Sequence, residues 1–268
     1  MTTLLQINAS INHDNGQSSQ LANQFVAAFR TRNPDAKIVV RHVAAADPVP
    51  HLNAERFGAF VTKPEERSTA QHAVVAYSDT LIHELKKADV IVLGLPMYNF
   101  GVPSQLKAYF DHIARAGVTF AYSDKGPVGL LTGKKVYVFA ARGGLYAGTP
   151  LDTQTTYVRD FLRFIGMTDV EFVYAEGLAV SPQSKEAGLA SAIAEIARLA
   201  AWRSPLAWRA PLEKNVFKET SHEYPQPGPR HRVDSHLRWR RCQTAPQPGQ
   251  RARPVCRSVS DARRVLFR

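Results

Sequence analysis

The chain has 268 residues, of which 44% are hydrophobic, enough for one large domain or two small ones. Its longest apolar runs fall far short of the roughly 18 residues that a membrane span needs, and residues 1–8 lack the basic segment and apolar stretch of a signal peptide. We therefore expect a cytoplasmic protein without a membrane segment.

The net charge of +11 is concentrated in the C-terminal part of the chain. Residues 203–268 carry 15 Lys and Arg against 5 Asp and Glu, whereas residues 1–202 carry 19 against 18. The C-terminal part also holds 8 of the 17 prolines and shows no sustained hydrophobic period. We expect residues 1–202 to form the folded domain and residues 203–268 to be a disordered basic tail.

Two hypotheses concern this tail. Its Arg, Pro and Gln content is typical of translation in a shifted reading frame. The rival hypothesis is a basic segment that binds nucleic acid. For residues 1–202, whose charges nearly balance, no nucleic-acid partner is expected.

The predicted elements alternate between strands and helices. Short apolar runs predict five strands, at residues 3–8, 37–43, 90–95, 134–141 and 169–175. Apolar residues at helical spacing predict five helices: one capped by Ser18 or Ser19, then 68–87, 104–116 closed by Gly117, one after Asp152, and 184–201. A long loop is expected over 44–67 and an irregular excursion over 118–133.

This alternation predicts an α/β fold, a doubly wound five-stranded parallel sheet of flavodoxin-like order 2-1-3-4-5 with helices on both faces. In such sheets ligands bind beyond the carboxyl ends of the strands, where the strand order reverses. Here that point lies between the first and third strands. Residues 10–19 are therefore expected beside residues 97–100.

Three segments at this edge carry groups suited to a ligand. Ser10, Gln17, Ser18 and Ser19 place hydroxyls and N–H groups at a helix N-terminus, which suits a phosphate, although an ordinary capped helix is the alternative. Residues 97–100, Met-Tyr-Asn-Phe, follow the buried strand and offer flat rings and an amide to a planar polar ligand. Residues 142–144, Arg-Gly-Gly, let backbone N–H groups approach a ligand, or form a flexible turn.

Several other chemistries find no support. No Walker loop, G-x-G-x-x-G after a strand or G-x-S-x-G elbow is present. The acidic residues of a phosphorelay receiver are missing from the strand ends. Residues 1–202 contain no Cys, and their six His show no ligand spacing, so no metal is expected. Phe120 and Tyr122 either cover a flat ligand or fill a core.

The three segments together make the chain resemble the FMN-dependent NADH azoreductase and NAD(P)H quinone reductase family. The most specific stretch is P-M-Y-N-F-G-V-P-S-Q-L-K at 96–107, continuing to Phe120. The stretches T-G-K-K-V-Y-V-F-A-A-R-G-G (132–144) and F-I-G-M-T-D-V-E-F-V-Y-A-E-G (164–177) match as well. The resemblance covers about residues 3–202.

The resemblance implies a homodimer with two FMN sites, electrons from NADH or NADPH, and quinones and azo compounds as acceptors in a ping-pong mechanism. The protein then positions the flavin, and no catalytic side chain is expected. Phe120 corresponds to an aromatic residue that reaches over the flavin from the partner subunit. The implied cofactor-binding residues are Ser10, Gly16, Gln17, Ser18, Met97, Tyr98, Asn99, Phe100, Ala141, Arg142, Gly143 and Gly144.

Within this set, Asn99 is the candidate partner of the flavin N5/O4 edge, and the Gly143 and Gly144 N–H groups are expected to stabilise the reduced ring. Gly16 and Ala141 stand where hydroxyl residues are frequent in the family, and each change removes one hydrogen bond, about 0.5–1.5 kcal/mol. An alternative function is a flavodoxin-like electron carrier that acts only with protein partners.

Overall fold

The computed structural model describes residues 1–45 and 47–201, so the predicted tail lies outside the described residues. Five strands form one parallel sheet: β1 Thr3–Asn8, β2 Lys37–His42, β3 Val90–Pro96, β6 Lys135–Ala141 and β7 Asp169–Ala175. Their order is β2-β1-β3-β6-β7. Counted along the chain this is 2-1-3-4-5, so the predicted topology is confirmed.

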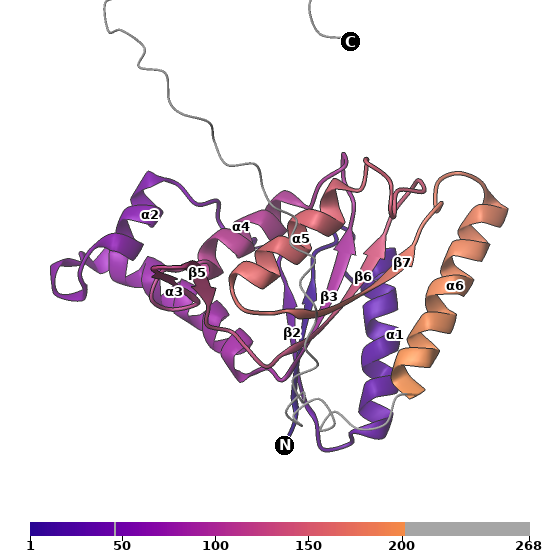
Figure 1. Cartoon of the computed structure of the whole chain (residues 1–268), viewed down its shortest axis with the longest axis horizontal. Coiled ribbons are helices and arrows are strands. Elements are labelled where there is room, and N and C mark those ends of the chain that lie inside the picture. The colour runs from indigo at the N-terminus through magenta and orange to yellow at the C-terminus, as the bar shows by residue number, and fades with distance from the viewer. Residues whose placement is uncertain (46, 202–268) are drawn as a thin grey trace, which may run out of the picture. The chain divides into compact units, whose positions relative to one another are not determined.

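Helices cover both faces of the sheet (Figure 1). One face carries α1 Gln17–Arg32 and α6 Pro182–Ala201, and the other carries α3 Thr69–Lys87, α4 Ser104–Ile113 and α5 Thr153–Phe164. A short helix, α2 Ala54–Val61, lies against α3. None of the helices in residues 1–45 and 47–201 combines the length and apolar character of a membrane span.

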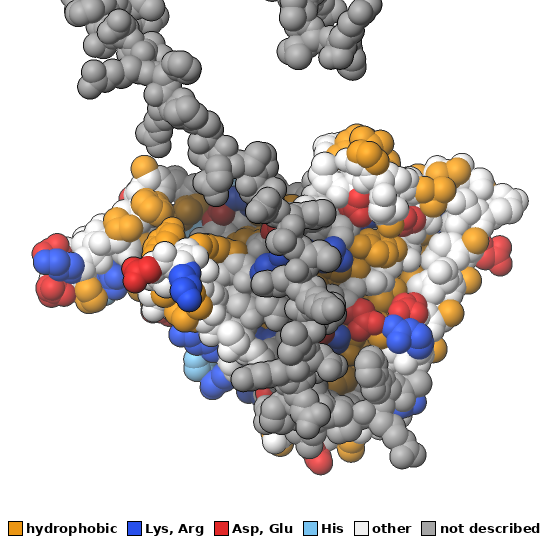
Figure 2. All heavy atoms as spheres, viewed as in Figure 1, with side chains coloured by type: hydrophobic (Ala, Val, Ile, Leu, Met, Phe, Trp, Pro, Cys, Tyr) orange, Lys and Arg blue, Asp and Glu red, His pale blue; other side chains and the backbone are white. Residues whose placement is uncertain are grey.

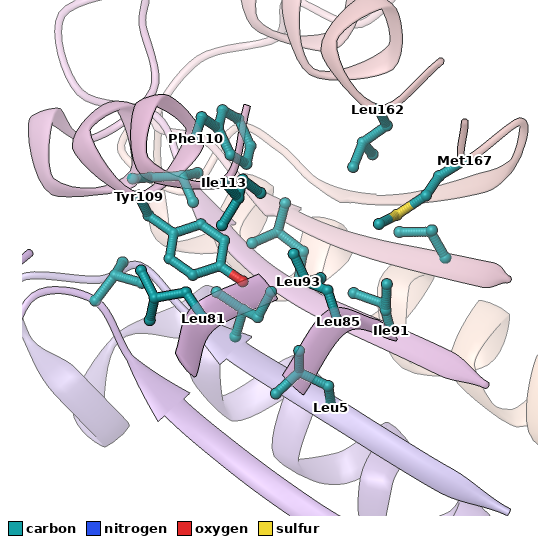
Figure 3. Packing of buried hydrophobic residues seen from close by; sticks show 14 of the residues in the cluster. Leu5, Leu81, Leu85, Ile91, Leu93, Tyr109, Phe110, Ile113, Leu162 and Met167 are labelled. Atoms are coloured by element: carbon teal, nitrogen blue, oxygen red, sulfur yellow. The ribbon is translucent and has the colours of Figure 1, made fainter. Parts of the chain in front are cut away.

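The two faces of the sheet have separate hydrophobic cores. The larger core packs Leu81, Leu93 and Phe110 between the sheet and helices α3, α4 and α5 (Figure 3). The smaller core sets Phe25 of α1 and Ile196 of α6 against the opposite face. All seven residues of β3 are buried, as expected for a strand covered on both sides.

Three predicted boundaries were wrong. Ser18 and Ser19 do not cap α1 but lie buried in its first turn, because Gly16 takes the extended N-cap conformation. Helix α4 ends at Ile113 rather than 116, since Ala114 already leaves helical geometry. Pro96 belongs to β3 instead of stopping it: β1 pairs no further than Gly94, so no neighbour on that side needs the N–H that Pro lacks.

Two predicted irregular segments contain regular structure. The loop expected over 44–67 includes α2, whose N-cap Asn53 accepts a hydrogen bond from the Arg56 N–H. Eight residues span only about two turns, too few to show a helical period. The excursion over 118–133 is an antiparallel hairpin of β4 Phe120–Ser123 and β5 Gly126–Gly129. The last helix begins at 182 rather than 184.

Candidate functional site

The carboxyl ends of β1, β3 and β6 meet at one edge of the sheet (Figure 1). Asn8 pairs with Gly94, and Pro96 pairs with Ala141. The Met97 N–H then donates to the Ala141 carbonyl at 3.1 Å. The loops that follow these strands are therefore neighbours, as the strand order predicted.

The loop after β1 reaches the loop after β3 through Tyr98. The Tyr98 hydroxyl lies 3.4 Å from Ser10 Oγ and accepts the Ile11 N–H at 3.3 Å. Ser10 is buried, and its Oγ also accepts the Asn12 N–H. Two of the three predicted segments are thus held together by side-chain hydrogen bonds.

Gly16 is needed because Ser10 approaches it closely. A Cβ atom at position 16 would lie 2.1 Å from Ser10 Oγ and 2.5 Å from Ser10 Cβ. Its φ of −69° suits any residue, so packing and not backbone conformation demands glycine here. The buried Ser10 therefore occupies the space that a hydroxyl side chain at position 16 would need.

The N-terminus of α1 offers donors without competitors. No side chain caps this helix, and its first turn contains no acidic residue. The hydroxyls of Ser18 and Ser19 are buried and find no hydrogen-bond partner among the described residues. A helix N-terminus with free N–H groups and nearby hydroxyls suits a phosphate or another anion.

The segment 97–100 ends in a tight, strained turn. Tyr98 and Gly101 exchange both backbone hydrogen bonds, at 3.0 and 3.2 Å. Between them Asn99 has a φ of 50° and Phe100 a φ of 62°. Positive φ at both central residues is the pattern of a type I′ turn, and it is unfavourable for a bulky residue such as Phe. Such strain persists only where surrounding contacts hold it.

The N-terminus of α5 supplies those contacts. The Thr153 hydroxyl donates to the Phe100 carbonyl at 2.6 Å. The buried Gln154 amide donates to the carbonyls of Pro96, at 2.9 Å, and Gly101, at 3.1 Å. Two side chains of α5 thereby hold both ends of the turn.

The Arg142 side chain is buried in an ion network. It contacts Asp152 at 2.9 Å and Glu176 at 3.1 Å, and donates to the Thr155 hydroxyl at 2.8 Å. Its guanidinium also lies 4.9 Å from the centre of the Tyr174 ring. Burial by itself raises the pKa of Asp152, but hydrogen bonds from Arg142 and Thr155 outweigh it and hold that pKa below its ordinary value.

Gly143 and Gly144 present their N–H groups at the same edge. The carbonyls of residues 142–144 accept hydrogen bonds from the N–H groups of Leu178, Ala179 and Gly177. The N–H groups of the two glycines donate to no other described residue. The backbone is therefore held through its carbonyls, while the two N–H groups are left without a partner among the described residues.

Exposed apolar side chains surround these donors. The Phe100 and Tyr146 rings meet edge to face, 5.5 Å apart, and Tyr146 also lies against Gly144. Phe100 is 50% exposed and Leu145 is 67% exposed. Figure 2 shows hydrophobic side chains gathered over the loops that follow β3 and β6. This surface suits a flat aromatic molecule.

Phe120 begins the β4–β5 hairpin, which is not part of the three segments. Its ring is buried against Phe164, 4.4 Å between ring centres. Its neighbour Tyr122 is 76% exposed.

Among the described residues, no group of three or more His, Cys, Asp or Glu side chains is placed so that it could hold a metal ion.

Four residues of the site were not predicted from the sequence: Thr153, Gln154, Glu176 and Tyr146. Glu176 accepts the N–H groups of Tyr146 and Ala147 as well as the Arg142 guanidinium. Its place directly after the last strand of the sheet was a usable signal. Thr153 and Gln154 follow a helix cap, and no local pattern distinguishes them from ordinary first-turn residues.

Comparisons with known proteins identify the family of this chain. The sequence model of a family described as having the flavodoxin-like fold matches residues 2–200. An FMN-dependent NADH:quinone oxidoreductase of Cellvibrio japonicus is 58% identical over 196 residues, 73% of this chain and 97% of the relative. FMN-dependent NADH:quinone oxidoreductase 6 of Burkholderia lata is 56% identical over 197 residues, 74% of this chain and 99% of the relative.

Solved structures give the same result. An azoreductase of Bacillus anthracis aligns with a TM-score of 0.69 at 28% identity, over 75% of this chain and 99% of that one. An FMN-dependent NADH-azoreductase of the same species, in complex with FMN, aligns at 0.67 and 27% identity, over 75% and 100%. The chain therefore belongs to the flavodoxin-like family of FMN-dependent NADH:quinone oxidoreductases and azoreductases.

Proposed function

We propose that this chain is an FMN-dependent oxidoreductase that transfers two electrons from NADH to quinones and reductively cleaves azo compounds. The names of the relatives support FMN, NADH and the type of reaction. The single observation that carries the proposal is that the free Gly143 and Gly144 N–H groups and the uncapped N-terminus of α1 lie at the same carboxyl edge of the sheet.

The residues present fit FMN at this edge. The FMN phosphate would lie at the N-terminus of α1, where Ser10, Gln17 and Ser18 place hydroxyl, amide and N–H groups around Gly16. Residues 97–100, Ala141 and residues 142–144 would line the ring. Because the Arg142 guanidinium is fully buried among carboxylates, only its backbone is left for the cofactor.

When bound, FMN supplies the redox chemistry, and the protein supplies position and environment. The Gly143 and Gly144 N–H groups favour negative charge on a ligand beside them. The Asn99 amide and backbone, in the strained turn, would face the polar edge of the ring. The exposed Phe100 and Tyr146 rings provide a flat apolar surface for donor and acceptor in turn, which is the basis of the proposed ping-pong mechanism.

We further propose that the enzyme is a homodimer in which Phe120 of one subunit borders the site of the other. This proposal rests on the resemblance and on the position of Phe120 at the start of the β4–β5 hairpin, outside the three segments. Sedimentation equilibrium of the purified protein tests it, and a monomer at micromolar concentration would contradict it.

The absorbance spectrum of the purified protein, followed by NADH oxidation with a small quinone, tests the function. A yellow protein that releases FMN and turns over quinone is the expected result. A protein that stays colourless after incubation with FMN would refute the cofactor. FMN-loaded protein without turnover would instead favour an electron carrier.

A further inference from the structure

We propose that Gln154, at the start of α5, is a positioning residue that holds the ring-binding turn at 97–100 in its strained conformation. The proposal rests on the proposed FMN site and deepens it. It assigns a role to a residue that has no place of its own at the cofactor.

The Gln154 amide bridges the two ends of the segment. Its Nε2 donates to the carbonyl before the segment, on Pro96, and to the carbonyl after it, on Gly101. Carbonyl oxygens only accept, so the NH₂ group of the amide must face both. The turn is therefore closed by one side chain from a helix that follows it by more than fifty residues.

The amide oxygen shows that this arrangement is maintained at a cost. Gln154 Oε1 is buried and has no hydrogen-bond partner among the described residues. A buried unpaired acceptor is unfavourable, and an apolar residue of similar size would avoid it. Holding the two carbonyls is the compensating contribution.

The two hydrogen bonds hold a strained backbone conformation in place. Asn99 and Phe100 both have positive φ, and the Thr153 hydroxyl binds the Phe100 carbonyl from the same helical turn. Without the amide, the turn is expected to relax toward ordinary φ values. The Asn99 N–H and the ring of Phe100 would then lose their fixed positions relative to Gly143 and Gly144.

The first turn of α5 also holds the second ring segment. Asp152 caps the helix through the Thr155 N–H and contacts the Arg142 guanidinium. Four consecutive residues, 152–155, thus reach both segments that line the ring. Gln154 positions the 97–100 segment, and the same helical turn supports the 142–144 segment through Arg142.

The test compares Gln154→Met with Val158→Ala. Methionine keeps the length of the side chain and removes both donors. Val158 is a fully buried α5 residue of the larger core whose side chain makes no hydrogen bond, so its truncation lowers stability without removing a hydrogen bond of the turn. Thermal unfolding of both apoproteins measures how much stability each variant has lost, so that the two variants can be compared at similar losses.

Two readouts are then measured. Amide hydrogen exchange of the apoprotein, followed in peptides covering 97–103, is expected to quicken about tenfold in Gln154→Met, as the loss of two hydrogen bonds implies. The FMN dissociation constant, from quenching of FMN fluorescence, is expected to rise by about the same factor. Val158→Ala should change neither by more than about twofold.

Each outcome decides the matter. Unchanged exchange at 97–103 in Gln154→Met, or equal effects in both variants, would overturn the positioning role. If the unmodified protein binds no FMN, the proposed function fails, whereas the exchange measurement still decides whether Gln154 holds the turn.

Discussion

Replacing Arg142 with Met tests whether the buried ion network fixes the second ring segment. The variant would leave two carboxylates without their cation, and the Asp152 and Glu176 side chains are only 7% and 14% exposed. Removing one partner of a buried ion pair costs about 3–5 kcal/mol. Glu176 keeps the N–H groups of Tyr146 and Ala147, so we expect a loss near the lower end, about 3 kcal/mol.

The pH dependence separates charge from packing. In the native protein the pKa of Asp152 lies below its ordinary value, so this group contributes stability above the unfolded pKa and loses it as the pH falls through the folded pKa. In Arg142→Met the hydrogen bond and the charge of the guanidinium, which both lower this pKa, are gone, so the pKa of Asp152 should lie above its value in the native protein. The stability difference between the two proteins should therefore shrink as the pH falls below about 5.

Urea unfolding of the apoproteins at pH 7 and pH 4.5 measures this difference. The matched control is Arg159→Met on the exposed side of α5, where the guanidinium lies 5.2 Å from the Phe172 ring centre and about 0.5–1 kcal/mol is expected. A loss below about 1 kcal/mol for Arg142→Met, or one that does not change with pH, would refute the charge argument.

Two further predictions follow from close packing and from burial. Gly16→Ala places a Cβ against Ser10 and should weaken FMN binding at least tenfold in a fluorescence titration, about 1.4 kcal/mol, whereas Gly58→Ala in open space on α2 should leave FMN binding unchanged. Burial lowers the pKa of His112, so the free energy of unfolding should fall as the pH drops below about 6.5, by up to about 1.4 kcal/mol per pH unit. His112→Gln should remove that slope between pH 6.5 and 5.5, and a slope that persists in urea titrations would contradict the assignment.

The sheet could be predicted because its signals are local. Each main strand is a short apolar run, and the buried β3 carries the strongest one. Five strands joined by right-handed crossovers then favour the flavodoxin-like order, which brings residues 10–19 beside residues 97–100. The contact of Ser10 with Tyr98 follows from that order.

Boundaries and supports were harder to predict because they depend on contacts between distant residues. Ser18 and Ser19 have good capping propensity, but the N-cap is Gly16, which packs closely against Ser10, so α1 begins two residues earlier than a Ser18 cap would place it. The hydrogen bonds of Gln154 span 53 and 58 residues along the chain. No periodicity in the sequence reports such a distance.

Arg142 shows how a residue at the right place can have a different role from the one its type suggests. A cation at a carboxyl edge is an obvious candidate for binding a phosphate-bearing cofactor, yet its charge is already met by Asp152 and Glu176. The ion network instead orders the chain on either side of Gly143 and Gly144. Since Asp152 also caps α5, and α5 holds the turn at 97–100 through Thr153 and Gln154, the two ring segments share one support. A shift of that helical turn as a whole should therefore disturb both segments together.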